Sequence, residues 1–291
     1  MTAPVMITGA AGQLGYELQR TVPDGVTVLP VDIQELDLTN ADAVDAFIGQ
    51  HRPSTIINGA AYTAVDKAES DPAVAHAVNV TAAASLAQSA HRHGARVIQI
   101  STDFVFGGAT TQPWRPHDAT APQSVYGVTK RDGELAVRSA LGDRALVIRT
   151  AWLYSAHGGN FVKTMLRLMR ERDEVRVIAD QIGTPTWANS LAHVLWAAVS
   201  RPDVSGTLHW TDAGVASWYD FALAIQEEAL GRGLLERSVP VHSISTSAYP
   251  TPAARPSYSV LDKSDTTRLL GAEPVHWRVN LRQMLDEVRD A

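Results

Sequence analysis

Short runs rich in apolar and β-branched residues alternate with longer stretches of helical spacing over the first half of the chain. Such runs are typical of parallel strands that are buried on both faces. The stretches between them predict helices: Val44, Phe47 and Ile48 share one helical face, and Thr39 with Asp42 three residues later predicts where that helix starts. The alternation predicts an α/β fold, a doubly wound parallel sheet of the Rossmann type. The expected strands are Val5–Thr8, Val26–Asp32, Thr55–Asn58, Val97–Ser101 and Leu146–Arg149.

The alternation becomes less regular after about residue 155. We therefore expect a first domain over residues 1–155 and a smaller C-terminal lobe over residues 156–291, partly interleaved with the first. The lobe combines helical patterns with a proline-rich loop: the patterns cover Asn160–Glu171, Trp187–Ser200, Trp218–Gly231 and Leu281–Asp290, and the loop covers Tyr249–Pro256.

The composition excludes several classes of function. Of the 291 residues, 45% are hydrophobic and 19% charged, an ordinary globular balance that leaves no case for disorder. The net charge of −6 and the lack of a basic cluster exclude a general nucleic-acid binder. Because the chain has no cysteine, disulfides, thiolate metal sites and cysteine nucleophiles are excluded. The sequence shows no targeting segment and no apolar run of the ~18 residues that a membrane span needs, so we expect a soluble, cytoplasmic protein.

The first strand ends in a glycine-rich loop, GAAGQLG. Gly9, Gly12 and Gly15 permit a tight turn and let the backbone approach a pyrophosphate, which would lie at the N-terminus of the next helix. Because the loop follows a strand and opens a helix near the start of the chain, it predicts dinucleotide binding by residues 1–155. Gln13 and Leu14, inside the loop, are expected to contact the cofactor too.

The second expected strand closes with Asp32, 23 residues after Gly9. A carboxylate at this place accepts hydrogen bonds from a ribose diol and repels a 2′-phosphate, and the next three residues supply no cation. The cofactor is therefore NADH or NADPH, with NADH favoured. Asp37 and Leu38 are expected to border the adenine. After the third strand, Ala61, Tyr62 and Thr63 are expected to pass close to the cofactor; simple packing is the alternative explanation.

Three residues carry the expected chemistry. Thr102 leaves the fourth strand at its carboxyl end, the edge where open α/β sheets bind ligands. Tyr126 and Lys130 are four residues apart and share one face of a helix that begins after Pro122. The Lys130 ammonium and an oxidised nicotinamide would lower the pKa of the Tyr126 phenol toward the working range. Thr102 would orient the substrate oxygen toward Tyr126.

This ordered set of glycine loop, acid, Ser/Thr at a strand end and Tyr-x-x-x-Lys resembles the extended short-chain dehydrogenase/reductase family. The segments GAAGQLGYELQ, AAYTAVDKAE, STDFVF, YGVTK, RTAWLY, NFVKTMLRL, QIGTPT and YPTPAARPS resemble, in this order, the dTDP-4-dehydrorhamnose reductase family. That resemblance implies an NAD(P)H-dependent oxidoreductase that reduces the C4 ketone of dTDP-4-dehydro-L-rhamnose to dTDP-L-rhamnose, the last step of dTDP-rhamnose synthesis.

The same resemblance implies roles in substrate binding. Besides Thr102, it assigns Asp103 and Trp152 to substrate contact, and Arg255 is the natural cation for a diphosphate. An ordinary core aromatic is the alternative for Trp152, and a solvated loop charge the alternative for Arg255. The C-terminal lobe is accordingly expected to bind the nucleotide sugar.

Some members of that family are metal-linked dimers that use glutamates from three segments. Glu17 and Glu287 fill two of those places, but the third is Asn189, a poorer ligand for a hard cation. The histidines form no ligand set either, so we expect no metal site and consider magnesium doubtful. The chain is expected to work as a monomer or a homodimer.

Three competing functions stay open. Sugar-nucleotide dehydratases and epimerases share the fold and the Tyr/Lys pair, but dehydration commonly uses a glutamate where this chain has Phe104. A reductase of another dTDP-ketosugar would carry the same motifs. A regulatory subunit that binds the dinucleotide without catalysis is the non-enzymatic alternative.

Overall fold

A computed structural model describes residues 3–108 and 110–290. Its centre is one sheet of six parallel strands, in the order β10-β5-β4-β3-β1-β2. This confirms the predicted doubly wound α/β class. The strands are β1 (Val5–Thr8), β2 (Val28–Val31), β3 (Thr55–Asn58), β4 (Arg96–Thr102), β5 (Ala145–Thr150) and β10 (Gly206–His209).

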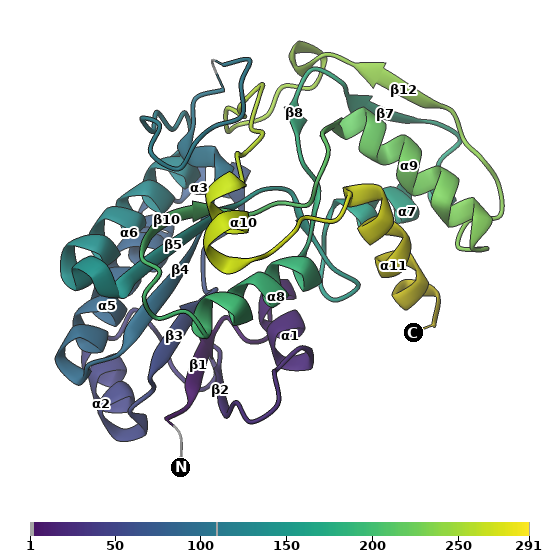
Figure 1. Ribbon diagram of the computed structural model, residues 1–291. Helices are drawn as coiled ribbons and strands as arrows, with labels where there is room; N and C mark the ends of the chain where they lie inside the picture. Colours follow the sequence, from purple (N-terminus) through teal and green to yellow (C-terminus); the bar gives the residue numbers. More distant parts are fainter. Residues whose placement is uncertain (1–2, 109, 291) are drawn as a thin grey trace.

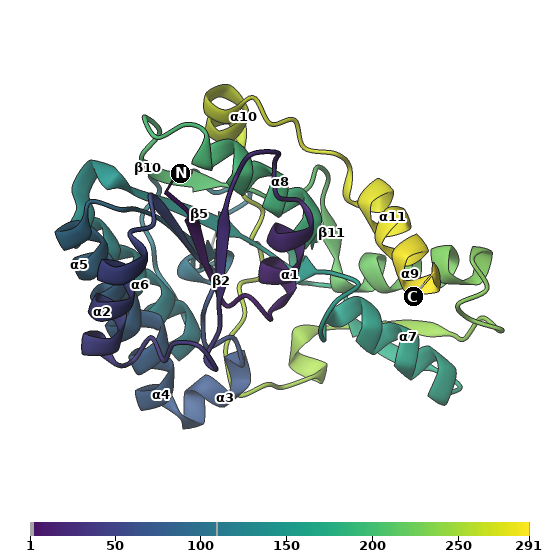
Figure 2. The ribbon, with the colours of Figure 1, turned by 90° about the horizontal axis from the view of Figure 1, so that it is seen from below.

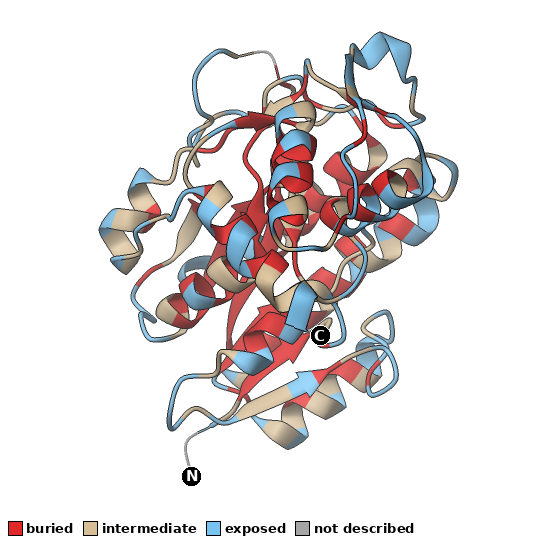
Figure 3. Ribbon diagram, turned by 90° about the vertical axis from the view of Figure 1, so that its right-hand side faces the viewer, coloured by how far each residue is buried: buried red, intermediate tan, exposed pale blue. Residues whose placement is uncertain are grey.

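Helices cover both faces of this sheet, and the two sets of helices lie on opposite sides in Figures 1 and 2. Alternate strand residues face opposite layers: Met6 packs against the first set, while Val5 and Ile7 pack against the second. The first set is α2 (Ala41–His51), α5 (Ala82–His93) and α6 (Val125–Leu141), and the second is α1 (Gln13–Arg20) and α8 (Ala188–Val199). The four inner strands of the sheet are wholly buried, whereas the edge strands β2 and β10 are only partly so (Figure 3).

The predicted start of α2 is wrong by one residue. The side chain of Asn40, not Thr39, caps the helix by accepting a hydrogen bond from the amide of Ala43. Thr39 instead donates its hydroxyl to the Asp37 carboxylate. Both residue types are good caps, so the competing bond to Asp37 decides between them.

The smaller lobe has its own apolar core, which joins α7, α9 and α11 around Phe221, Ile225 and Leu281. The helices are α7 (Phe161–Glu171), α9 (Trp218–Gly231) and α11 (Trp277–Asp290). Its short strands pair as β7 (Val175–Ile178) with β12 (Val241–Ile244), β6 (Leu153–Tyr154) with β9 (Thr186–Trp187), and β8 (Ile182–Gly183) with β11 (Ala216–Ser217).

The chain passes between the two parts more than once. Strand β10 comes from residues 206–209, yet it completes the edge of the main sheet next to β5. Helix α8 likewise follows the start of the lobe and packs against α1, where the indole of Trp196 donates to the carbonyl of Leu18 at 3.2 Å. Short helices complete the chain: α3 (Val65–Ser70), α4 (Pro72–His76), a π-helical turn over Ala77–Thr81, and α10 (Ser264–Leu270).

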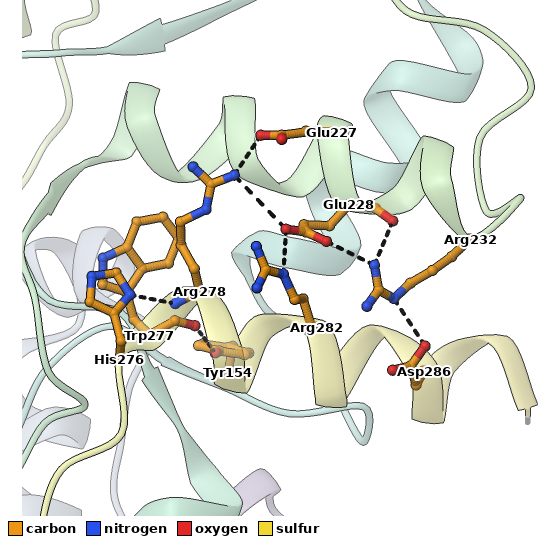
Figure 4. A network of polar contacts seen from close by, with 9 residues as sticks. All are labelled: Tyr154, Glu227, Glu228, Arg232, His276, Trp277, Arg278, Arg282 and Asp286. Atoms are coloured by element: carbon orange, nitrogen blue, oxygen red, sulfur yellow. Dashed lines mark hydrogen bonds and ion pairs between the residues drawn. The ribbon is translucent and has the colours of Figure 1, made fainter.

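A charged network fastens α11 to α9 (Figure 4). The carboxylate of Glu228, 9% exposed, accepts from Arg282 at 2.7 Å and from Arg232 at 2.8 Å. Arg232 also donates to Asp286 at 3.0 Å, so one arginine links two carboxylates on facing helices. The C-terminal helix is therefore fastened to the second half of α9.

None of the helices in the described ranges is long and apolar enough to cross a membrane.

Candidate active site

A cleft of about 830 Å³ lies along the carboxyl ends of the sheet strands. This is the edge at which doubly wound sheets bind ligands. Most of the residues predicted for the site line it: Gly9, Gly12, Gln13, Leu14, Gly15, Asp32, Asp37, Leu38, Ala61, Thr63, Thr102, Asp103, Tyr126, Lys130 and Trp152. Tyr62 and Arg255 are absent from this lining.

The glycine loop forms the floor of one end of the cleft. Gly9 has a φ of +68°, a conformation that side chains disfavour. At Gly15, a Cβ would lie 2.6 Å from Ala10 Cα, so helix α1 can approach the loop only without a side chain there. Gly12 caps α1, and no side chain bonds its first amides. The free N–H groups and the helix dipole therefore fit a pyrophosphate.

Asp32 stands at the end of β2 beside this loop. Its Oδ2 accepts from the amide of Ala11 at 2.8 Å, and its Oδ1 accepts from the amide of Ile33 at 2.8 Å. The carboxylate thus braces the glycine loop and keeps lone pairs for a ribose diol. Lys130 is the one cationic side chain among the described residues that line the cleft, and it comes from α6, not from the segments around Asp32. Nothing in the lining near Asp32 offsets its negative charge.

Residues 61–63 divide into two roles. Ala61 and Thr63 line the cleft, whereas Tyr62 lies behind it, packed in the small apolar cluster that contains Tyr126. The backbone of Tyr62 is held by Asn79 of the π-helical turn: the Tyr62 amide donates to Asn79 Oδ1 at 2.9 Å. Tyr62 therefore sits beneath the binding surface.

Thr102, Tyr126 and Lys130 meet at the centre of the cleft. Thr102 ends β4, while Tyr126 and Lys130 project from the first turns of α6. The hydroxyl of Ser124 caps α6 by accepting from the amide of Gly127 at 3.1 Å, which fixes where the helix starts and where Tyr126 points. The ring of Phe104 packs edge-on against Tyr126, with centroids 5.5 Å apart.

Burial dominates the acid–base properties of Tyr126 and Lys130. Burial raises the pKa of Tyr126 to about 12, against a smaller opposing effect of the Thr102 hydroxyl. The Lys130 ammonium donates to the carbonyl of Ile100 at 2.7 Å. Burial lowers the pKa of Lys130 to about 8. A Tyr126 phenol with this raised pKa is protonated at neutral pH.

Asp103 lies next to Thr102 and is 2% exposed. Its Oδ1 accepts from the Thr102 hydroxyl at 3.0 Å, and the Ser259 hydroxyl also favours the charged carboxylate. Burial raises the pKa of Asp103 to about 6. Asp103 therefore holds the Thr102 hydroxyl from behind the cleft.

An ion pair that the sequence did not reveal lies behind Lys130. Glu134, one turn further along α6, forms a bidentate pair with Arg149 of β5, at 2.7 and 2.9 Å. The two side chains are only 4% and 5% exposed. The Arg149 guanidinium also lies over the ring of Phe106, 5.1 Å from its centroid. The pair ties the helix that carries Tyr126 and Lys130 to the sheet.

Arg255 is already paired in this structure. Its guanidinium forms a bidentate pair with Asp66 at 2.7 and 3.0 Å, and its side chain is 22% exposed. The amide of Ala253 also donates to Asp66 at 3.2 Å. The carboxylate thereby fastens the proline-rich loop to the start of α3, and Arg255 lowers the pKa of Asp66.

The proposed metal ligands do not fit a divalent cation. Glu17 is fully buried, and its carboxylate accepts from Ser155 at 2.6 Å and from Asn189 at 3.0 Å. Arg20 lies 3.5 Å from Glu17 and forms a bidentate pair with Glu287 at 2.5 and 2.8 Å. A guanidinium therefore already supplies the positive charge between the two carboxylates. Across residues 3–108 and 110–290, no other group of His, Asp or Glu gathers into a metal site.

Comparison with known proteins agrees with this arrangement. Residues 2–290 match the family model described as the RmlD substrate binding domain. A curated dTDP-4-dehydrorhamnose reductase of Escherichia coli is 40% identical over 292 residues, which cover 98% of this chain and 97% of the relative. The chain belongs to the dTDP-4-dehydrorhamnose reductase family.

Solved structures of the family share the whole fold. A dTDP-4-dehydrorhamnose reductase from Clostridium acetobutylicum superposes with a TM-score of 0.93 at 40% identity, covering 98% of this chain and 99% of that one. A second, from Bacillus anthracis, gives a TM-score of 0.92 at 36% identity, covering 99% and 100%, and was solved in complex with NADP. The resemblance inferred from the sequence motifs is confirmed.

Two residues at the cleft, Asn160 and His157, carry no motif that predicts their place there. Asn160 lines the cleft and donates to Gln13 at 2.9 Å, which brings a loop of the smaller lobe against the glycine loop. His157, in the same loop, lies 3.0 Å from the carbonyl of Ala11. Asn is a typical helix cap, so the role of Asn160 at the start of α7 could have been predicted. Its contact with Gln13 could not, because that contact joins two distant segments of the chain.

Proposed function

We propose that this chain is an NAD(P)H-dependent reductase that converts the C4 ketone of dTDP-4-dehydro-L-rhamnose into the alcohol of dTDP-L-rhamnose. In this proposal the enzyme works in the cytoplasm, as a monomer or as a homodimer that no metal links. The observation that carries the proposal is the meeting of Thr102, Tyr126 and Lys130 in a cleft whose far end is the glycine loop. Membership of the reductase family supports the choice of substrate.

The cofactor-binding residues follow from the same cleft. The amides after Gly12 would receive the pyrophosphate, Asp32 the adenosine ribose, and Asp37 and Leu38 the adenine. Ala61 and Thr63 would line the path toward the nicotinamide. When bound, the reduced nicotinamide supplies the hydride that the ketone carbon accepts.

Tyr126 is the proton donor in this proposal. Its raised pKa keeps the phenol protonated at neutral pH, so it can donate to the ketone oxygen as negative charge develops there. The Thr102 hydroxyl would donate a second hydrogen bond and fix the oxygen in place. Once the proton has left, the Lys130 ammonium stabilises the phenolate, which solvent then reprotonates. The carbon gains the hydride and the oxygen gains the proton, so the reduction is balanced.

Asp103, Trp152 and Arg255 would bind the nucleotide sugar. Asp103 and Trp152 both line the cleft, where the carboxyl would accept from a sugar hydroxyl once its bonds to Thr102 and Ser259 rearrange. Because Asp66 already neutralises Arg255, diphosphate binding requires the guanidinium to shift its bonds from the carboxylate to phosphate oxygens.

The test is the oxidation of NADH and of NADPH by the purified protein with dTDP-4-dehydro-L-rhamnose, followed by the absorbance of the reduced nicotinamide. Oxidation with formation of dTDP-L-rhamnose, verified by NMR of the product, is the expected result. Absence of oxidation by a protein that binds both ligands would overturn the proposal in favour of another dTDP-ketosugar or a regulatory subunit.

A further inference from the structure

Two indoles are stacked at the junction between the cleft and the smaller lobe. The rings of Trp152 and Trp218 have centroids 3.5 Å apart and planes inclined by 7°. Trp152 lines the cleft, whereas Trp218 begins α9 and does not. Behind the stack, Phe161 packs against Trp218 with centroids 4.7 Å apart and leads into the core of the lobe. Trp218 therefore connects the lobe core to a residue of the cleft.

Trp152 is held in an unfavourable backbone conformation. Its φ is +49°, in the left-handed region that bulky residues disfavour. Such strain persists only where the surroundings fix the residue, and it is found most often at functional sites. The carbonyl of Trp152 accepts from the amide of Thr186 at 3.1 Å, which fixes the backbone. The stack with Trp218 fixes the ring.

Gly183 packs directly against the Trp152 ring. A Cβ at this position would lie 2.6 Å from Cε2 of Trp152, so only glycine leaves room for the indole. The φ of Gly183 is not in the left-handed region, so its backbone alone would accept a side chain. Gly183 of β8 pairs with Ala216 of β11, two residues before Trp218. The β8–β11 ladder thus joins Gly183, which packs against the Trp152 ring, to the segment that leads into Trp218.

We propose that Trp218 and Gly183 are positioning residues that hold the Trp152 indole at the sugar end of the cleft and thereby set the affinity for the deoxysugar of the substrate. The inference rests on the proposed function. The part of the half-buried Trp152 indole that lines the cleft can bury the apolar C–H groups of a sugar ring, and it does so best when the indole is fixed beforehand. Neither positioning residue touches the substrate itself.

The first test compares Trp218→Leu with Trp218→Phe and with the matched control Tyr219→Leu. Tyr219 is the next residue of α9, is partly buried, and has no ring stack within the described part of the chain. Binding of dTDP-4-dehydro-L-rhamnose is measured by calorimetry on enzyme loaded with NAD⁺, which cannot reduce the sugar. The exciton couplet of the stacked indoles is measured by far-ultraviolet circular dichroism.

The leucine variant is expected to lose the couplet and to raise Kd and KM for the sugar nucleotide about 3- to 10-fold, as expected for one lost aromatic pair. The Kd for NADH stays unchanged, because the glycine loop is untouched. The phenylalanine variant restores most of the sugar affinity, and Tyr219→Leu changes neither the couplet nor the affinity. In a Trp152→Ala background, Trp218→Leu adds no further loss, because Trp218 acts through Trp152.

The second test displaces the Trp152 ring by a substitution at Gly183. Gly183→Ala displaces the Trp152 ring and is expected to give the same loss of couplet and sugar affinity with unchanged NADH binding. The control is Gly231→Ala at the end of α9, where a Cβ would meet nothing within 4 Å. If Trp218→Leu fails to fold, Gly183→Ala and Trp218→Phe carry the comparison.

Three results would overturn the inference: a wild-type protein without the couplet, folded variants that bind the sugar nucleotide as tightly as the wild type, or an equal loss of NADH affinity. These results are distinct from failure of the proposed function. Wild-type protein that binds the sugar nucleotide but does not reduce it refutes the reaction and leaves the Kd comparison valid. Wild-type protein that reduces the sugar, with variants of unchanged Kd, refutes only the positioning role.

Discussion

Replacement of Asp32 by asparagine isolates the charge at the ribose end of the cleft. The amide oxygen can still accept from the amide of Ala11, so the brace on the glycine loop is retained while the negative charge is removed. The Asp32→Asn variant should therefore lose its preference for NADH while the glycine loop keeps its conformation. Asp32→Ala, which removes the brace as well, should weaken NADH binding further.

The size of the change follows from the surroundings of Asp32. At about 4 Å, repulsion between the carboxylate and one unit of charge on a 2′-phosphate is about 1 kcal/mol in bulk water and about 4 kcal/mol at an effective dielectric of 20. Since Asp32 is only partly buried and no lining cation lies near it, about 1–2 kcal/mol applies. Loss of a charged acceptor for the ribose hydroxyls adds about 1 kcal/mol against NADH. The ratio of kcat/KM for NADPH over NADH should rise about 30- to 150-fold.

The assay is kcat/KM for both cofactors at fixed sugar nucleotide and fixed ionic strength. Glu35→Gln is the matched control, because Glu35 carries the same charge three residues later and is outside the cleft lining. It should change the ratio only a few-fold, as expected for a solvent-screened charge. An Asp32→Asn variant whose two kcat/KM values fall equally, or whose ratio equals that of Glu35→Gln, would refute the role of Asp32.

The other expectations concern proton transfer, stability and metal. Tyr126→Phe should lose at least about 100-fold in kcat, because the proton donor is gone, while the Kd for NADH measured by calorimetry changes little. Because burial holds the pKa of Lys130 near 8, kcat/KM should fall as the pH rises through about 8, and Lys130→Arg should lack that decline. Arg149→Met should lower the free energy of unfolding in urea by about 3–5 kcal/mol, since Glu134 is left as an unpaired buried charge, and adding Glu134→Gln should recover much of it. A chelator should leave activity and oligomeric state unchanged, because Arg20 occupies the place of a cation.

Each of these four predictions has an outcome that would contradict it. Substantial turnover by Tyr126→Phe would remove Tyr126 as the donor. A wild-type profile that stays flat well above pH ~8 would show that Lys130 does not titrate there. An Arg149→Met variant that is as stable as its double mutant with Glu134→Gln would show that the Glu134 charge is solvated. Activity lost to the chelator and restored by magnesium would contradict the role of Arg20.

The sequence was sufficient for the main sheet and for the chemistry at its edge. Strands buried on both faces are nearly continuous apolar runs, and the glycine loop, Thr102 and Tyr126–Lys130 each follow a strand or open a helix, so local rules place them at one edge. The sixth strand was missed because Gly206–His209 is short and half polar. Its pairing with β5 depends on a partner far away in the sequence, which no local pattern contains.

The contacts that position the side chains of the site could not be predicted either, because they too depend on partners far away in the sequence. Lys130 bonds to the carbonyl of Ile100, an acceptor that every residue possesses and that no sequence pattern marks. Asp66 and Arg255 are 189 residues apart, and no local pattern marks them as partners. Trp218 opens a helix with a recognisable Ser217 cap, but its stack on Trp152 depends on how two parts of the chain are folded together.

Synthesis on the ribosome delivers the parts of the main sheet out of spatial order. The five strands β1 to β5 are complete by Thr150, but the edge strand β10 and the covering helix α8 emerge only after part of the smaller lobe. Until then the nascent chain presents the apolar face formed by Ile7, Leu14 and Ile98, which Leu195 of α8 later buries. Such a face is a surface that chaperones bind, so this protein should depend on them most while residues 151–209 are being made.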